Sequence, residues 1–586
     1  MKKIIQYVGM IAVLLGFCTC SDLMDKGPLD KISETAIWND LNLAEAFINN
    51  QYKVLPNVYS GDFCRSHRLS FFTDEATDKY MGSGTADYYR GGMSPSNLTS
   101  LNSWKYHYDY IRGCNIFLKN ADDLPATTDA DKKKKDRMKG EALTLRAWSY
   151  LDLAARYGGV VKITEPFELS DDFIHPRSSF EEIMELIIED LDAAIGLLPE
   201  EYDSKDWGRL TKGAAMGLKS RALLYAASPL FNKTNDKAKW EAAAKATKDV
   251  IDYAERTQLY DLVGDKDTYS DIFRTWPNKE MMITMINYPK YGSWYFSYPD
   301  GVGGGVDGNG THDGWSTTMI SQKMVDAFEM IDGTPFDWSN PVHAANPYAN
   351  RDPRLDVDVT HDGSMWVYED TFVEFWICEK SNNFNLPQYK DNVYPAITPG
   401  FEMDDKVYGK NILGNKAQVG NMPEVGYIYR KALDVYFEDA YASEPYITAW
   451  IVMRYSEILL NYAEALFETG NEAQAKIYLN KIRNRVSMPP VTATGNELRK
   501  KIQHERWIEL CFEAHRYFDA RRWLIAEKEF SDPFYGISIV KDKNSDKKVY
   551  TPFKFQDRSF PKQYYLQPIP LDEIQKSGIT QNEGYN

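Results

Sequence analysis

Amphipathic segments with helical periodicity occur in pairs along most of this chain. In residues 139–157, apolar and small side chains recur at three- and four-residue spacing from Ala142 to Ala154, as expected for one face of an α-helix. The same pattern predicts helices over residues 42–52, 179–198, 211–228, 238–256, 450–469, 471–486, 497–511 and 514–526. Two such helices occupy about 34 residues or slightly more, which is typical of tetratricopeptide-like hairpins. The hairpins are not contiguous, so the pattern predicts a helical scaffold with insertions.

The largest insertion covers residues 257–449 and is rich in Gly, Pro, Asn and aromatic residues. It contains short β-prone runs at 281–286, 365–368 and 372–377, and one helical stretch at 321–330. We therefore predict a mainly α fold with about four tetratricopeptide-like helix pairs and a large irregular, loop-rich α/β insertion. The predicted divisions are a signal peptide (1–19), a lipidated tether (20–40), an N-terminal helical region (41–256), the insertion (257–449) and a C-terminal helical region (450–586).

The N-terminus has the features of an export signal. Lys2 and Lys3 precede an apolar stretch that begins at Ile4, ends at Phe17 and is too short to span a bilayer as a permanent helix. Cys20 follows the small residue Thr19, and a cysteine in this place resembles the acylation site of bacterial lipoproteins. We therefore expect a lipid on Cys20 to anchor the mature protein to a membrane.

Charge and motif content argue against several classes of function. The formal net charge is −17, which repels phosphate backbones and argues against a nucleic-acid partner. Cys64, Cys114, Cys378 and Cys511 form no Cys-x-x-Cys pair, so a zinc site is not supported. The sequence also lacks a Gly-x-Ser-x-Gly elbow and a phosphate-binding loop. We predict a protein with no catalytic residues, no metal and no cofactor.

Three strings in the C-terminal third are similar to those of a known family. The first, from Arg454 to Ala465, resembles an R-x-x-E-x-x-L-x-x-A-E-A helix, and the second, from Leu479 to Arg485, resembles L-N-x-I-R-x-R. The third, from Glu505 to Asp519, resembles E-R-x-x-E-L-x-F-E-G-x-R-x-F-D, with Ala514 where glycine is usual. These strings resemble those of the SusD/RagB family of nutrient-uptake outer-membrane lipoproteins.

The resemblance extends over nearly the whole mature chain. Further similar positions are Thr73-Asp74-Glu75, Trp104, Tyr108, Asn115, Arg146-Ala147-Trp148, Tyr157-Gly158-Gly159, Ser228-Pro229-Leu230-Phe231, Asp332-Gly333 and Asn350-Arg351-Asp352-Pro353-Arg354. The resemblance implies a lipid-anchored protein on the outside of the outer membrane, whose partners are a SusC-like TonB-dependent transporter and a glycan clasped between the two. It implies capture and delivery, in which no bond is broken.

The charged residues of these strings have a structural interpretation of their own. Arginines and carboxylates recur at helical spacing within otherwise apolar helices, which suits partly buried ion pairs that fix helix register. These residues are Arg454, Glu457, Glu464, Arg483, Arg485, Glu505, Arg506, Glu509, Glu513, Arg516 and Asp519. We do not count them as a binding site. Trp104 and Trp148 lie within periodic helices and are assigned to the helical core.

A smaller irregular insertion, residues 80–103, interrupts the first helical region. The ligand hypothesis depends on aromatic residues in this smaller insertion and in the larger one at 257–449. Rings on a platform stack on the apolar faces of sugars, while polar side chains between them bind hydroxyls. In the resembled family, glycan contacts come from these same two loop regions. The predicted binding residues are Tyr88, Tyr89, Arg90, Trp294, Tyr295, Tyr298 and Trp315. We expect at least two of the six rings to face solvent on one side.

Two alternatives remain open at this point. Relatives within the resembled family serve oligopeptide import, and the aromatic loops favour sugars over peptides only modestly. A secreted glycoside hydrolase would need two converging carboxylates, which sequence alone does not exclude. The sequence does not indicate which glycan would be bound.

Overall fold

The fold is taken from a computed structural model of the 586-residue chain. It describes residues 34–56, 66–78, 84–167, 174–287, 318–366, 425–432, 448–542 and 547–585, together with short pieces at 371–372, 375, 377–379, 402–403, 406–408 and 544–545. The signal peptide, Cys20 and the tether up to residue 33 lie outside these residues, whereas the end of the predicted tether, residues 34–40, is described and contains helix α2 (Glu34–Trp38). Among the described helices, none combines the length and the apolar character that crossing a membrane requires.

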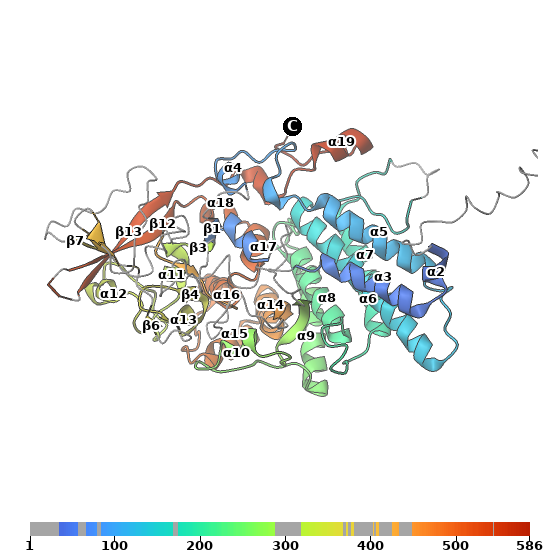
Figure 1. Cartoon of the computed structure of the whole chain (residues 1–586), viewed down its shortest axis with the longest axis horizontal. Coiled ribbons are helices and arrows are strands. Elements are labelled where there is room, and N and C mark those ends of the chain that lie inside the picture. The colour runs from blue at the N-terminus through green and yellow to red at the C-terminus, as the bar shows by residue number, and fades with distance from the viewer. Residues whose placement is uncertain are drawn as a thin grey trace, which may run out of the picture.

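One half of the molecule is built of paired helices, which lie on the right of Figure 1. Helix α6 packs on both α5 and α7, α8 packs on α9, and α14 packs on α9 and α15. The mainly helical fold with tetratricopeptide-like pairs is thereby confirmed. The helices of the N-terminal region are α3 (Leu41–Gln51), α4 (Thr85–Tyr89), α5 (Trp104–Asn120), α6 (Asp129–Tyr157), α7 (Phe180–Leu197), α8 (Lys212–Ala227) and α9 (Lys237–Thr257). Helix α2 (Glu34–Trp38) precedes them, and α10 (Asp271–Arg274) lies at the start of the insertion.

Local capping explains where several of these helices begin. The Ser179 hydroxyl accepts a hydrogen bond from the Glu182 backbone N–H, and the Glu182 carboxylate accepts one from the Ser179 N–H. This reciprocal capping box satisfies donors that the first turn of α7 would otherwise leave unpaired. Thr128 and Asp131 form the same arrangement at the start of α6, ten residues before the helix predicted from periodicity.

The C-terminal region continues the helical frame but contains one correction. Residues 450–454, predicted as helix, belong to strand β11 (Thr448–Arg454), which pairs antiparallel with β2 (Met281–Asn287). The run from Trp450 to Met453 is buried, and a short fully apolar run fits a buried strand as well as a helix. The helices that follow are α14 (Tyr455–Glu468), α15 (Glu472–Arg485), α16 (Gly495–Glu509), α17 (His515–Arg522), α18 (Ala526–Glu529) and α19 (Leu571–Ser577).

Short strands and helices form the other end of the molecule, on the left of Figure 1. One sheet has the order β1 (Ala76–Asp78), β3 (Thr318–Ile320), β10 (Ile428–Tyr429), β4 (Val359–Thr360). A second has the order β13 (Lys548–Gln556), β12 (Phe534–Lys541), β7 (Ile377–Glu379), β9 (Lys406–Tyr408), β8 (Glu402–Met403). The remaining elements are β5 (Met365–Trp366), β6 (Thr371–Phe372), α11 (Gln322–Ala327), α12 (Pro341–Ala345) and α13 (Arg354–Asp358). The β-prone runs at 281–286 and 365–368 thus contain strands, and α11 lies within the predicted helical stretch.

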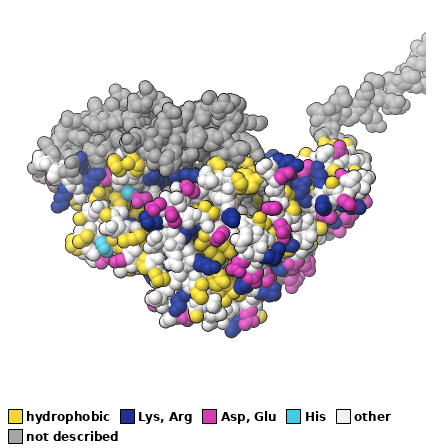
Figure 2. Space-filling view, turned by 90° about the horizontal axis from the view of Figure 1, so that it is seen from below, with side chains coloured by type: hydrophobic (Ala, Val, Ile, Leu, Met, Phe, Trp, Pro, Cys, Tyr) yellow, Lys and Arg dark blue, Asp and Glu magenta, His cyan; other side chains and the backbone are white. Residues whose placement is uncertain are grey.

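Two large hydrophobic clusters correspond to these two ends. One joins the paired helices to β11 and α14, and includes Leu145, Ile187 and Ile458. The other surrounds the short strands and includes Ile320 and Phe512. On the face seen in Figure 2, basic and acidic side chains are interspersed over the described surface.

Candidate functional site

Strand pairing brings the two insertions close to each other. Strand β1 ends at Asp78, just before the smaller insertion, and β3 begins at Thr318 within the larger insertion, shortly after the aromatic segment 294–315. These two residues are paired partners in the antiparallel register of β1 and β3. The start of the smaller insertion and the end of the aromatic segment, about 240 residues apart in sequence, therefore meet at one end of this strand pair. Loops in such a place commonly carry binding residues.

Tyr88 and Tyr89 require a correction to the predicted ring platform. They lie on helix α4 and are only 1% and 2% exposed, so neither ring offers a face to a ligand. Tyr88 packs against Phe72 and Tyr564. The sequence shows a Gly-rich irregular segment here and does not show the distant residues that cover the rings. Arg90, which directly follows α4, is exposed.

The hydroxyl of Tyr89 donates a hydrogen bond to the Phe71 carbonyl, and the Arg558 guanidinium lies 3.9 Å from its ring centroid. Burial raises the pKa of both Tyr88 and Tyr89. These two residues therefore support the base of the insertion. Trp294, Tyr295, Tyr298 and Trp315 lie outside the described residues, so their place in a binding site stays a prediction.

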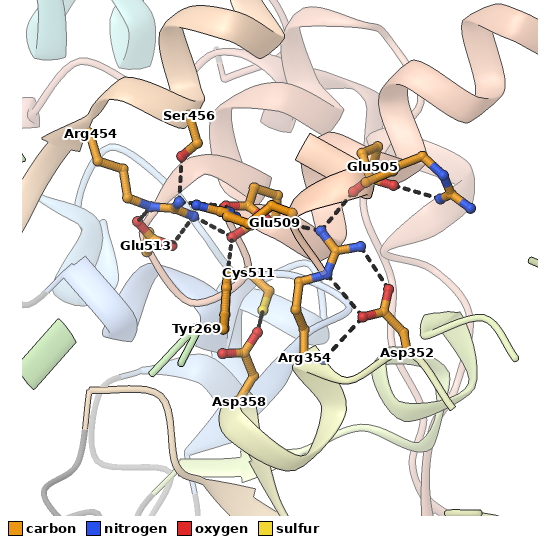
Figure 3. A network of polar contacts seen from close by, with 12 residues as sticks. Tyr269, Asp352, Arg354, Asp358, Arg454, Ser456, Glu505, Glu509, Cys511 and Glu513 are labelled. Carbon is orange, nitrogen blue, oxygen red and sulfur yellow. Dashed lines mark hydrogen bonds and ion pairs between the residues drawn. The ribbon is translucent and has the colours of Figure 1, made fainter. Parts of the chain in front are cut away.

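A dense network of buried ion pairs forms the centre of the C-terminal region (Figure 3). The Glu509 carboxylate accepts hydrogen bonds from Arg354, Arg454 and Arg485. Burial alone would raise the pKa of Glu509, but the guanidinium groups of Arg485, Arg454 and Arg354 hold it well below its usual range. The Glu509 carboxylate is therefore ionised, and three guanidinium groups bind its two oxygens.

The surrounding pairs extend this network between elements. Arg354, fully buried after the turn at Asp352, also binds Glu505 at 2.6 Å on α16. Arg483 on α15 binds Glu505 at 2.7 Å, and Arg454 at the end of β11 binds Glu280 at 2.7 Å. The pairs join α13, α15, α16 and β11 into one frame, as predicted. Because the carboxylates are occupied by guanidinium groups, this frame offers no open position for acid–base chemistry.

A pocket of about 80 Å³ lies where the paired helices meet the C-terminal region, and we call it the seam pocket. Trp148 packs against the helical core, as predicted, and is also partly exposed and lines this pocket, whereas Trp104 is buried as predicted. The pocket walls come from α5, α6, α8, β11 and α17, and include Trp450 and His515. Sequence reasoning missed the pocket, because no local motif links residues so far apart in the chain.

Residues 280–585 match the family described as "SusD family", and residues 29–224 match "Starch-binding associating with outer membrane". A curated relative, SusD-like protein P38 of Formosa agariphila, is 23% identical over 89% of this chain and 92% of its own length.

Among solved structures, a SusD-like protein of Bacteroides fragilis is 28% identical and superposes with a TM-score of 0.74 over 96% of this chain and 100% of its own. A laminarin-binding SusD-like protein is 20% identical, with a TM-score of 0.63 over 93% of this chain and 100% of its own. The first family match alone covers more than half of the 586 residues. The chain belongs to the SusD family.

Proposed function

We propose that this protein is a surface glycan-binding lipoprotein that captures oligosaccharides or polysaccharides and delivers them to a SusC-like TonB-dependent transporter. The observation that carries the proposal is the pairing of Asp78 with Thr318, which places the residue before the smaller insertion beside a residue that closely follows the aromatic segment 294–315. One insertion contributes Arg90, and the other contributes Trp294, Tyr295, Tyr298 and Trp315. Aromatic rings and polar groups gathered at one place are the usual means of binding sugars.

Relatives of similar fold support the choice of ligand. One solved structure is titled a laminarin-binding SusD-like protein, and another, from Bacteroides fragilis, a SusD-like carbohydrate-binding protein. We propose that the present chain acts in the same way, by binding without catalysis. The carboxylates of Glu505 and Glu509 agree with this role, because both are engaged in ion pairs with arginines and neither is free to act as an acid or base.

Calorimetry on the purified protein with a panel of glycans and a panel of oligopeptides tests the ligand class. We expect binding to at least one glycan, with the glycan intact after prolonged incubation. Trp294→Ala and Trp315→Ala should each weaken that binding about tenfold or more, since stacked rings contribute substantially. Binding to peptides alone would favour the oligopeptide alternative, and cleavage of the bound glycan would favour a hydrolase.

The anchor is tested separately through Cys20. We propose that its thiol is acylated, so that the protein is held on the outer face of the outer membrane. Labelling with a radioactive fatty acid should mark the wild-type protein but not Cys20→Ala, and the variant should leave the membrane fraction. Cys18→Ala, two residues away, serves as the matched control and should keep the label.

A further inference from the structure

The seam pocket combines aromatic walls with a mouth open to solvent. Trp148 and Phe518 line it and are partly exposed, whereas Trp450 on the opposite element β11 is buried. The Arg221 guanidinium lies 5.4 Å from the Trp148 ring centroid, and that of Arg156 lies 5.4 Å from the Phe518 ring centroid. Both arginines line the pocket together with the rings and contact them by cation–π interactions. A ligand in this pocket would therefore contact aromatic side chains.

The charges of the pocket are already neutralised by their own counter-charges. Arg156 pairs with Asp152 at 2.5 Å, and Arg221 pairs with Glu457 at 2.6 Å. The Glu513 carboxylate is held by Arg454 at 2.7 Å. An ionic ligand would therefore find no complementary charge here and would lose its hydration. The pocket favours a neutral ligand.

Two residues that line the pocket each have a buried nitrogen atom without a hydrogen-bond partner in the described structure. His107 is 2% exposed, and its Nε2 lies 3.5 Å from the Asp152 carboxylate, while its Nδ1 has no hydrogen-bond partner among the described residues. Trp450 is 4% exposed, and its indole Nε1–H likewise has no partner within the described part of the chain. Buried polar groups are normally paired, so each of these two nitrogens can take a partner from beyond the described residues.

We propose that the seam pocket binds one neutral sugar ring, either a free monosaccharide or the terminal residue of a glycan. The apolar face of the ring packs on the aromatic walls. One hydroxyl oxygen accepts the hydrogen bond of Trp450 Nε1–H, and a second hydroxyl pairs with His107 Nδ1. Since this assignment uses only the seam pocket, it does not depend on the ligand loops of the proposed function.

The size of the pocket sets the upper limit of the ligand. At roughly 10–15 Å³ per water, 80 Å³ holds about five to eight waters. Pockets for larger ligands usually measure about 300–1,000 Å³. The seam pocket therefore accepts one ring that enters through the open side, with any remaining sugars of a glycan left outside. The α5 groove, of about 270 Å³ near Tyr108 and Phe167, is larger but has exposed charged residues at its rim.

The test uses the full-length protein, saturation-transfer NMR and calorimetry with common neutral monosaccharides and with oligosaccharides of the same sugars. Trp450→Phe keeps an aromatic ring and removes the N–H, so we expect Kd to rise roughly three- to tenfold, as for one neutral hydrogen bond. Ala155→Leu fills the pocket from α6 and should abolish binding there. Trp523→Phe is the matched control, because the Trp523 Nε1–H is bonded to Glu464 at 2.7 Å and Trp523 does not line the pocket.

The outcomes separate this inference from the proposed function. Loss with Trp450→Phe for monosaccharides alone indicates free sugars as ligands, and loss for both ligand sets indicates the terminal residue of a glycan. If the two pocket variants fold, as judged by thermal unfolding, yet bind every ligand like wild type, the pocket holds only water and the inference is wrong. Oligosaccharide binding that depends on Trp294 but not on Trp450 would leave the proposed function intact. Monosaccharide binding in the pocket without any glycan binding at the loops would support the seam pocket as a sugar site and would contradict the proposed function.

Discussion

The ion-pair network around Glu509 and the seam pocket are two buried polar regions with opposite organisation. In the network, the carboxylate is enclosed by Arg354, Arg454 and Arg485. In the pocket, the charges are paired as well, but two uncharged ring nitrogens, on His107 and Trp450, have no partner among the described residues. The network around Glu509 holds more charge than the seam pocket, but its charged groups are all bound to one another and are less available to a ligand.

This difference gives a physical reason why the ion-pair network serves stability and the seam pocket can serve binding. A buried charge must be compensated within the fold, because leaving it unpaired would cost several kcal/mol. A buried neutral donor costs only about 1–3 kcal/mol when unpaired, so a protein can keep one for a ligand. We therefore expect mutations in the network to change stability, and mutations in the pocket to change binding.

Glu509→Gln removes the negative charge at the centre of the ion-pair network and should have the largest effect on stability. The neutral amide cannot compensate three buried guanidinium groups, so the free energy of unfolding should fall by about 3–5 kcal/mol. Urea unfolding at neutral pH measures it. Glu497→Gln on the same helix is the control, since the exposed Glu497–Lys500 pair contributes at most about 1 kcal/mol. Equal effects of the two substitutions would contradict a structural role for the network.

Glu75 is a contrasting buried carboxyl group, because the nearby positive charge is too small to offset the effect of burial on its pKa. Burial raises its pKa to about 8, although the Ser70 hydroxyl donates to it at 2.6 Å. In the unfolded chain its pKa is 4.5, so between about pH 4.5 and 8 the folded state holds one more proton. This group therefore makes the free energy of unfolding fall as pH rises through that window.

Glu75→Gln should remove that dependence. Relative to wild type, the variant should gain stability from pH 5 to pH 8, by on the order of 3 kcal/mol. Denaturant unfolding at several pH values provides the measurement. Parallel pH profiles for the two proteins would show that Glu75 is already ionised in the native state.

Two buried tryptophans allow a paired and an unpaired indole N–H to be compared directly. Trp523 donates its Nε1–H to Glu464 at 2.7 Å, whereas the same group of Trp450 has no partner in the described structure. Substitution by Phe removes similar apolar volume at both sites. Trp523→Phe should therefore destabilise the protein by about 1.5–3 kcal/mol more than Trp450→Phe, the usual contribution of a hydrogen bond to a charged group. Similar losses in thermal unfolding would mean that the Trp450 N–H is paired after all.

Much of the frame could be predicted from sequence, because helix formation is largely local. The period of apolar residues located α7 within one residue at each end, and Ser179 marked its start. Charges at helical spacing also predicted the network, since Glu505 and Glu509 lie one turn apart on α16. What failed depended on distant partners. Residues 450–454 are a strand because β2 pairs with them, and Tyr88 is buried because residues near 560 cover it.

The candidate sites follow the same division. Loop composition could suggest Trp294 and Trp315 as ligand residues, but no pattern within α4 indicated that Tyr88 and Tyr89 face inward. The seam pocket is formed by residues more than 300 positions apart, such as His107 and Trp450. A site of this kind depends on packing between elements, which periodicity does not report.

Ala514→Gly is the smallest expected effect and concerns the wall of the seam pocket itself. Ala514 has φ +69°, a left-handed conformation that costs a side chain with a Cβ about 1–2 kcal/mol. Glycine adopts it freely but loses more entropy on folding, so the net gain in stability should be about 0.5–1 kcal/mol. Chemical denaturation measures this gain, and Ala473→Gly, in the exposed part of helix α15, should instead lose about 1 kcal/mol. Because Ala514 contributes only a methyl group to the pocket, the variant should bind sugars at least as well as wild type. A stabilised protein that had lost binding would show that the methyl group, and not the two unpaired nitrogens alone, shapes the site.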